Sequence, residues 1–170
     1  IPHPAGSLDE IRGPRGETII SGVWRLPERM RCLFHVTKRD LVAGLRSIGI
    51  EECANFFVHS SMRAFGHVEG GAETVCDALL EAAGSRGTVA VPTFTWKQNI
   101  DQEFVQFDLR RDACETGAIP EAFRRRPGAL RSEHVCHSVA AIGPLAPALM
   151  GDGVRAFGPG SGMHQLYELD

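Results

Sequence analysis

The sequence has no apolar run that approaches about 18 residues, so we expect no membrane-spanning helix. It also lacks an excess of positive charge, because 18 Lys and Arg residues stand against 21 Asp and Glu residues, for a net charge of −3. This balance gives no electrostatic basis for a dedicated nucleic-acid-binding protein and suits a cationic ligand better. Internal repeats and low-complexity tracts are missing as well. A length of 170 residues therefore predicts roughly one globular domain with a substantial core.

Cysteine pairs with the spacing of metal ligands are also missing. The five cysteines are spread along the chain and include no C-x-x-C pair, so the sequence predicts neither a disulfide framework nor a zinc ribbon. The first residues, Ile1 to Pro4, contain no initiator Met and no apolar signal segment. We therefore expect a processed, trimmed or partial chain in a reducing compartment, the cytoplasm.

Helical and strand-like segments alternate in most of the chain. The pattern predicts, in order, a helix over 38–48, a buried strand over 55–59, a helix between Gly70-Gly71 and Gly84, a buried strand over 87–92, a short helix over 121–126 and a third strand over 138–143. Such alternation is typical of an α/β domain with a largely parallel central sheet. Residues 1–36 are rich in proline and glycine, which predicts an irregular arm outside this domain.

Polar residues follow two of the predicted strands, at the point where each strand ends. Ser60 and Ser61 come after the first strand, and Thr93 and Thr95 come after the second. In α/β domains ligands gather at the carboxyl ends of parallel strands, so these positions are the first candidates for chemistry. The polar segment over 97–117 predicts a long loop, and loops of that length in compact domains are usually functional or disordered.

Longer stretches of the sequence carry a more specific signal. They are VHSSMRAFG over 58–66, VEGGAET over 68–74, GTVAVPT over 87–93, FRRRPGALRSEH over 123–134 and HSVAAIGP over 137–144. In this order and spacing they resemble the aminoglycoside 3-N-acetyltransferase family, and the resemblance runs from about Thr37 to Asp170. It implies a three-layer α/β/α fold with a largely parallel sheet and a family domain over 37–170, shortened at its carboxyl end.

The resemblance implies transfer of an acetyl group from acetyl-coenzyme A to the 3-amino group of a deoxystreptamine antibiotic, which is an antibiotic-resistance activity without a metal. Coenzyme A offers phosphates and a pantetheine arm, which suit backbone N–H groups, hydroxyls and arginine. The family's cofactor contacts fall here on His59, Ser60, Ser61, Thr93, Arg131, Ser132 and His134. The alternative for the paired serines is a turn that caps a helix. For Arg124-Arg125-Arg126, a solvated helix face is favoured over a phosphate clamp.

Because the substrate is a polycation, its binding site is expected to be lined by carboxylates. Asp101 and Glu103 fall near a position where the family places acidic substrate contacts, although a gap is needed to align them. The alternative is that these acids only keep a surface loop solvated. For Trp96, which precedes them in the chain, a packing role is favoured over a role as a platform on which a sugar ring stacks.

Catalysis needs a base for the attacking amine and a donor for the developing oxyanion. The family's histidine base would lie beyond Asp170, so His137 is the candidate substitute in this chain, with a structural or cofactor-contact role as its alternative. The spacing His134-x-Cys136-His137 is a weak zinc signal without a fourth ligand. Val135 and Gly162 stand where the family usually has proline.

Three hypotheses remain open from the sequence. The first is an aminoglycoside acetyltransferase, and the second is an inactive remnant that binds coenzyme A or an aminoglycoside. The third is an interaction module. It draws on the arm of residues 1–36 and on an exposed sheet edge, which predicts self-association.

Overall fold

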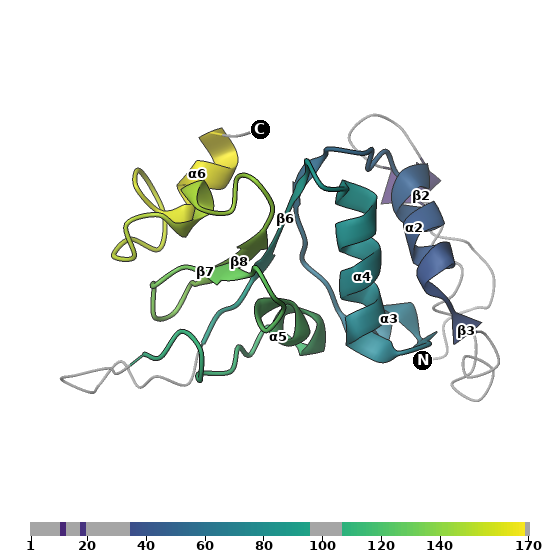
Figure 1. Ribbon diagram of the computed structural model, residues 1–170, viewed down its shortest axis with the longest axis horizontal. Helices are drawn as coiled ribbons and strands as arrows, with labels where there is room; N and C mark the ends of the chain where they lie inside the picture. The colour runs from purple at the N-terminus through teal and green to yellow at the C-terminus, as the bar shows by residue number, and fades with distance from the viewer. Residues whose placement is uncertain (1–10, 13–17, 20–34, 96–106, 169–170) are drawn as a thin grey trace, which may run out of the picture. The chain divides into compact units, whose positions relative to one another are not determined.

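The chain is described by a computed structural model, which covers residues 11–12, 18–19, 35–95 and 107–168 (Figure 1). It divides into two units, residues 1–34 and 35–170. In the first unit β1 (Ile11–Arg12) pairs antiparallel with β2 (Thr18–Ile19). All elements described below belong to the second unit.

The first helix of this unit is the one predicted over 38–48, and it opens with a capping box. Helix α2 (Lys38–Ser47) begins after Thr37, whose hydroxyl accepts a hydrogen bond from the Asp40 N–H at 3.3 Å. The Asp40 carboxylate in turn accepts from the Thr37 hydroxyl at 2.6 Å and from the Thr37 N–H at 3.0 Å, and these two bonds to the carboxylate hold the pKa of Asp40 below its ordinary value. The helix ends just before Gly49, which takes a positive φ of 92°.

Helix α4 (Gly71–Ala83) links this outer helix to the sheet. It carries an apolar face, because Val75, Ala78, Leu79 and Ala82 are all buried. Helix α2 packs against α4, and α4 packs against the central strand β6 (Thr88–Pro92), whose five residues are all buried. Two small elements precede α4, namely α3 (Met62–Phe65) and β5 (His67–Val68), which pairs in parallel with β3 (His35–Val36).

The central sheet is mixed. Its order is β4-β6-β8-β7, with β4 over Asn55–Phe57, β8 over Val139–Ile142 and β7 over Leu130–Arg131. Strands β4 and β6 are parallel, whereas β6–β8 and β7–β8 are antiparallel. The predicted largely parallel sheet is therefore wrong for the described residues. Only residues 132–138 join β7 to β8, and a parallel connection needs about a dozen residues or more.

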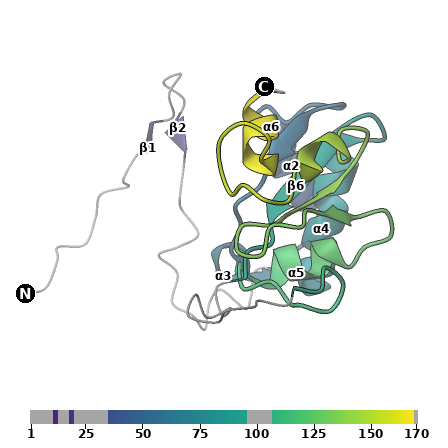
Figure 2. The same cartoon turned by 90° about the vertical axis from the view of Figure 1, so that its left-hand side faces the viewer.

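Successive residues along a strand of the sheet point alternately into two apolar layers, as the three-layer architecture requires. Val89 and Val91 of β6 face the cluster formed by α4 and by α5 (Ala118–Arg124). Ala90 faces the other side, with η2 (Ala148–Met150) and α6 (Gly162–Glu168). Figure 1 shows α4 and α6 on opposite sides of β6, and Figure 2 shows α5 and α6 well separated. The α/β class and the three layers are confirmed.

The short helix α5 starts earlier than the sequence predicts. Its first residue is Ala118, so Pro120 lies inside the first turn and does not open the helix. The first turn tolerates proline because the N–H groups there have no partner within the helix. None of the helices in the described part of the chain is long and apolar enough to cross a membrane.

Candidate functional site

Three segments meet at the edge of the sheet where β4 and β6 end. Residues 59–61 follow β4 and residues 93–95 follow β6. Because β8 runs antiparallel to β6, the loop over 132–138 that precedes it reaches the same edge. Neighbouring strands lie about 4.8 Å apart, so the ends of β4 and β8 on either side of β6 are about 10 Å apart. The topology thus brings together all the predicted cofactor residues.

Thr93 and Ser138 form a fully buried hydroxyl pair at this edge, both 0% exposed. The Ser138 hydroxyl donates to the Thr93 carbonyl oxygen at 2.6 Å. A hydroxyl carries one hydrogen, so in the 3.0 Å contact with the Thr93 hydroxyl the threonine is the donor. Thr93, predicted to contact the cofactor, has its hydroxyl inside the protein.

Arg131 is tied into the same network. Its Nε donates to the Ser138 hydroxyl at 3.1 Å, and Nη2 donates to the Thr93 carbonyl at 2.9 Å. Its Nη1 donates to the carbonyls of Leu109 at 3.2 Å and Asp112 at 2.6 Å. Burial, followed by the positive charge of Arg124, lowers the pKa of Arg131. Four of the five N–H donors of a guanidinium are thus engaged with protein oxygens.

Ser132 follows β7 and is hydrogen-bonded to the first residue of β8. It is 4% exposed, its hydroxyl accepts from the Val139 N–H at 2.9 Å, and its own N–H donates to the Val139 carbonyl at 2.9 Å. We call Thr93, Arg131, Ser132 and Ser138 the buried frame. Three of the seven predicted cofactor residues lie in it.

The histidine of the loop above this frame has a defined tautomer. Nδ1 of His134 accepts from the backbone N–H groups of Cys136 at 3.2 Å and His137 at 3.0 Å. The proton of the neutral ring is therefore on Nε2, which is a donor. Burial, and after it the nearby His137, lowers the pKa of His134. This residue is suited to donate a hydrogen bond and poorly suited to act as a base at neutral pH.

His137, the candidate base, sits in an aromatic environment. Its ring centroid lies 5.0 Å from Phe94, 5.0 Å from Phe157 and 5.5 Å from His134. Phe157 is 60% exposed, so the ring cluster reaches the surface. No signal in the sequence pointed to Phe157, which comes from a loop far along the chain. The same loop as His137 holds Cys136, and no group of three metal-ligating side chains occurs among the described residues.

The loop after β4 supplies the polar groups that remain open to a ligand. The Ser60 hydroxyl is buried and has no hydrogen-bond partner among the described residues. Such a group costs free energy unless something binds it. His59 is exposed and its ring lies 5.0 Å from that of Phe57. Ser61 stands at the start of α3, yet its side chain makes no capping bond.

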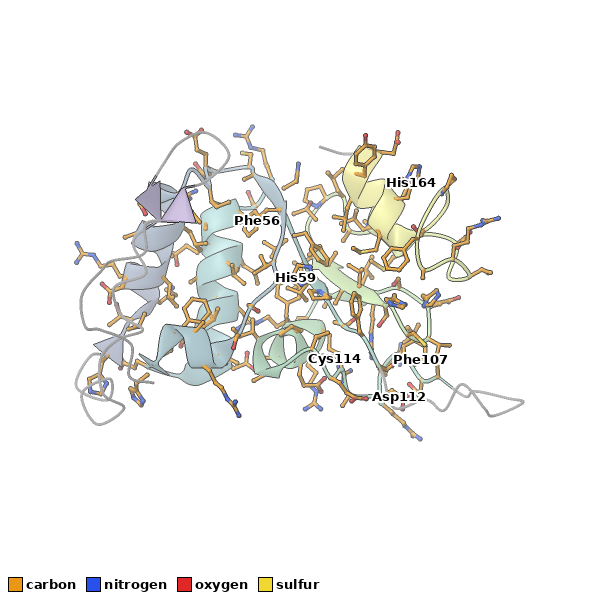
Figure 3. The ribbon with its side chains drawn as sticks, turned by 180° about the vertical axis from the view of Figure 1, so that it is seen from behind. Phe56, His59, Phe107, Asp112, Cys114 and His164 are labelled. Atoms are coloured by element: carbon orange, nitrogen blue, oxygen red, sulfur yellow. The ribbon has the colours of Figure 1, made fainter. Side chains whose placement is uncertain are left out.

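In the arginine run at the end of α5 only Arg125 is exposed to solvent as predicted, whereas Arg124 and Arg126 are ion-paired with carboxylates of the protein. Arg124 is 9% exposed, donates to both Glu121 carboxylate oxygens at 2.6 Å and reaches the Arg110 carbonyl at 3.0 Å. Arg126 pairs with Asp77 at 2.6 Å and with Glu73 at 2.9 Å. Figure 3 shows Phe107, Asp112 and Cys114 near one another at this end of the unit, away from His164. The predicted substrate residues Asp101 and Glu103, and Trp96, lie outside the described residues.

A family model for aminoglycoside 3-N-acetyltransferases matches residues 57–170. The chain belongs to this family. Aminoglycoside N(3)-acetyltransferase VII of Streptomyces paromomycinus is 37% identical over 133 residues, which are 69% of this chain and 46% of that relative. The chain thus spans about half the length of the curated relatives it matches.

Solved structures of family members share the fold. The aminoglycoside acetyltransferase AAC(3)-Xa superposes with a TM-score of 0.74 at 33% identity, over 84% of this chain and 56% of that one. The binary complex of AAC-IIIb with CoASH gives a TM-score of 0.72 at 26% identity, over 80% and 57% of the two chains. The loops after β4 and between β7 and β8 both lie inside the part that the family model matches.

A cavity of about 530 Å³ lies elsewhere on this family member. It is lined by Asn55, Phe56, Phe57, Thr88, Leu145, Leu149, Met163, Leu166 and Tyr167. These residues come from β4, the start of β6, the segment that includes η2, and α6, and they include none of the predicted site residues. The cavity and the sheet-edge site are therefore separate features.

Proposed function

We propose that this chain is an aminoglycoside N3-acetyltransferase that takes acetyl from acetyl-coenzyme A and confers antibiotic resistance. The observation that carries the proposal is the buried Ser60 hydroxyl at the carboxyl edge of the sheet, which has no partner among the described residues and lies inside the stretch matched by the family model. The CoASH complex of AAC-IIIb, a relative of the same fold, supports the choice of cosubstrate. We also propose that residues 37–170 form the acetyltransferase domain and residues 1–36 an arm outside it.

In this proposal His59, Ser60, Ser61 and His134 contact the acetyl donor. The Ser60 hydroxyl and Nε2–H of His134 donate hydrogen bonds to oxygens of the bound thioester or its pantetheine arm. Such donors also stabilise negative charge as it develops on the thioester oxygen. Thr93, Arg131 and Ser132 belong to the buried frame and do not contact the acetyl donor directly. Their hydrogen bonds fix the loops that carry the contacting residues.

The reaction joins the substrate amine nitrogen to the acetyl carbon and breaks the carbon–sulfur bond. The thiolate of coenzyme A leaves, and the proton lost by the amine must reach a base. We assign His137 as this base in the present chain, because it lies in the loop that also carries His134 and its ring cluster reaches the surface. Asp101 and Glu103 are proposed to attract the cationic aminoglycoside.

The 3-amino group of a deoxystreptamine antibiotic is the proposed acceptor. We place the reaction in the cytoplasm, because Cys53, Cys76, Cys114 and Cys136 are free thiols, as a reducing compartment favours. We also propose that the chain self-associates through β4, which pairs on one side only, with β6, among the described strands. Light scattering after size-exclusion chromatography tests this, and a clean monomer would contradict it.

Release of the coenzyme A thiol on addition of kanamycin or gentamicin tests the function. Thiol is measured against a blank that contains the protein, because its own cysteines react with the same reagent. The proposal predicts release with the unchanged chain, a loss of at least about a hundredfold in His137→Asn, and unchanged release in His164→Asn. Binding of acetyl-coenzyme A without release of the thiol would instead support an inactive remnant. Absence of binding would support an interaction module.

A further inference from the structure

We propose that Arg131 is a positioning residue for the acyl-transfer site and not a ligand of the cosubstrate's phosphates, an inference that rests on the proposed function. Position in a family motif and positive charge favour a phosphate ligand for such a residue. The geometry points to another role. The guanidinium is turned inward, onto three chain segments, two of which, 93–95 and 132–138, meet at the site.

The hydrogen bonds of Arg131 occupy most of its donors. Nε and both Nη atoms donate to protein oxygens, and the guanidinium carbon lies 4.9 Å from the centre of the Phe107 ring. A phosphate bound in the bidentate manner would need two parallel donors at once. Four donors are already used, and one remains. Binding phosphate in this manner would therefore break bonds to buried oxygens.

The oxygens that Arg131 holds come from separate segments. Thr93 directly follows β6, Ser138 directly precedes β8, and Leu109 and Asp112 belong to the segment between β6 and α5. The frame extends to the histidine loop through the Thr95 N–H, which donates to the Cys136 carbonyl at 3.2 Å, and through the Thr95 hydroxyl, which donates to the Val135 carbonyl. Arg131 thereby fixes the backbone that presents His134 and His137.

The test compares two acetyl donors in one variant. Arg131→Lys keeps the charge and loses the planar fork of donors. Dissociation constants are measured for acetyl-coenzyme A and for S-acetylpantetheine, which lacks the nucleotide phosphates. Arg126→Lys is the matched control, since Arg126 is also half-buried but is ion-paired with Glu73 and Asp77 of α4, away from the sheet edge. Circular dichroism confirms that each variant is folded at the working temperature.

A positioning role predicts that Arg131→Lys weakens the binding of both acetyl donors by the same factor, on the order of tenfold. Arg126→Lys should leave both dissociation constants unchanged. A loss confined to acetyl-coenzyme A would make Arg131 a phosphate ligand and overturn the proposal. Equal affinities of Arg131→Lys and the unchanged chain for both donors would overturn it as well.

Amide hydrogen exchange keeps the proposal testable if the unchanged chain binds neither donor, an outcome that would refute the proposed function. The N–H groups of Thr93 and Thr95 donate to the carbonyls of Ser138 and Cys136, and the His137 N–H donates to Nδ1 of His134 within the loop that this pairing holds. They should exchange markedly faster in Arg131→Lys and at the native rate in Arg126→Lys. Native exchange rates at all three positions in Arg131→Lys would show that Arg131 positions nothing at this site.

Discussion

The His134 ring is fixed by hydrogen bonds from two backbone N–H groups, and it is their acceptor. Two N–H groups, of Cys136 and His137, depend on its Nδ1 as their acceptor. Replacement by Leu leaves both without a partner in a half-buried loop, at a cost of about 1–3 kcal/mol in the free energy of unfolding. His134→Asn offers an amide oxygen at about the place of Nδ1 and should cost less than half as much. Urea unfolding at pH 7 measures both, and equal losses in the two variants would contradict the assigned bonds.

The residue types at the site could be predicted from the sequence, but several of their roles could not. Ser60 and His134 lie in the expected stretches and keep groups available for a ligand. Thr93, Arg131 and Ser132 lie in the same stretches, yet their polar atoms are used inside the protein. Spacing along a chain does not say which hydrogen bonds a side chain makes once strands that are distant in sequence have paired. That information comes from the pairing of β6 with β8.

At the scale of elements, Glu121 of α5 joins its helix to the segment before it. Its carboxylate accepts from Arg124 and from the Cys114 N–H at 2.9 Å, and its side chain is 21% exposed. Burial alone would raise the pKa of Glu121, but the hydrogen bonds from Arg124 and Cys114 outweigh it and lower the pKa from 4.5 to about 2. This ion pair therefore stabilises the fold above the unfolded-state pKa.

The sign of the pH dependence follows from that shift. The folded state binds its proton on Glu121 less tightly than the unfolded state, so stability is lost as the pH falls from about 5 towards 2. The full effect is on the order of 3 kcal/mol. Glu121→Gln should lose about this amount at pH 7 and show a flatter decline in acid. Chemical unfolding at a series of pH values measures it, and parallel curves for the two proteins would refute this role.

Gly143, just after β8, tests the close contact between β8 and the start of β6. It takes a φ of 133°, and a Cβ there would lie 2.6 Å from the Cα of Thr88. Gly143→Ala should therefore destabilise the fold by more than about 1 kcal/mol. Gly44→Ala is the matched control, because a Cβ at that position in helix α2 would meet no neighbouring group within 4 Å. Thermal unfolding of both variants gives the comparison, and a native midpoint for Gly143→Ala would contradict the packing.

Elements with local signals are the ones that sequence reasoning finds. The capping box of Thr37 and Asp40 and the apolar face of α4 depend on neighbours within a few residues, so α2 and α4 were predicted closely. Strand β7 contains two residues, too few to show a period of two. Without β7 the hairpin to β8 was missed, and with it the antiparallel direction of two of the three strand pairings.

At the scale of the whole molecule, the family fold brings one edge of the sheet together from segments far apart in sequence. Family membership is shown over residues 57–170, and the structural relatives share the arrangement. The chain spans about half the length of the curated relatives. Its own contribution to the proposed reaction is the edge where Ser60 and the histidine loop meet, and that contribution is open to direct measurement.

Calorimetric titration of acetyl-coenzyme A into the purified chain is the most direct test. We expect binding at one site, weakened on the order of tenfold in Ser60→Ala because a hydrogen bond worth about 1 kcal/mol or more is lost. Ser85→Ala, an exposed serine before β6 at the opposite edge of the sheet, should bind like the unchanged chain. Absence of binding heat, or equal affinity in Ser60→Ala, would contradict an acetyl-donor site at this edge.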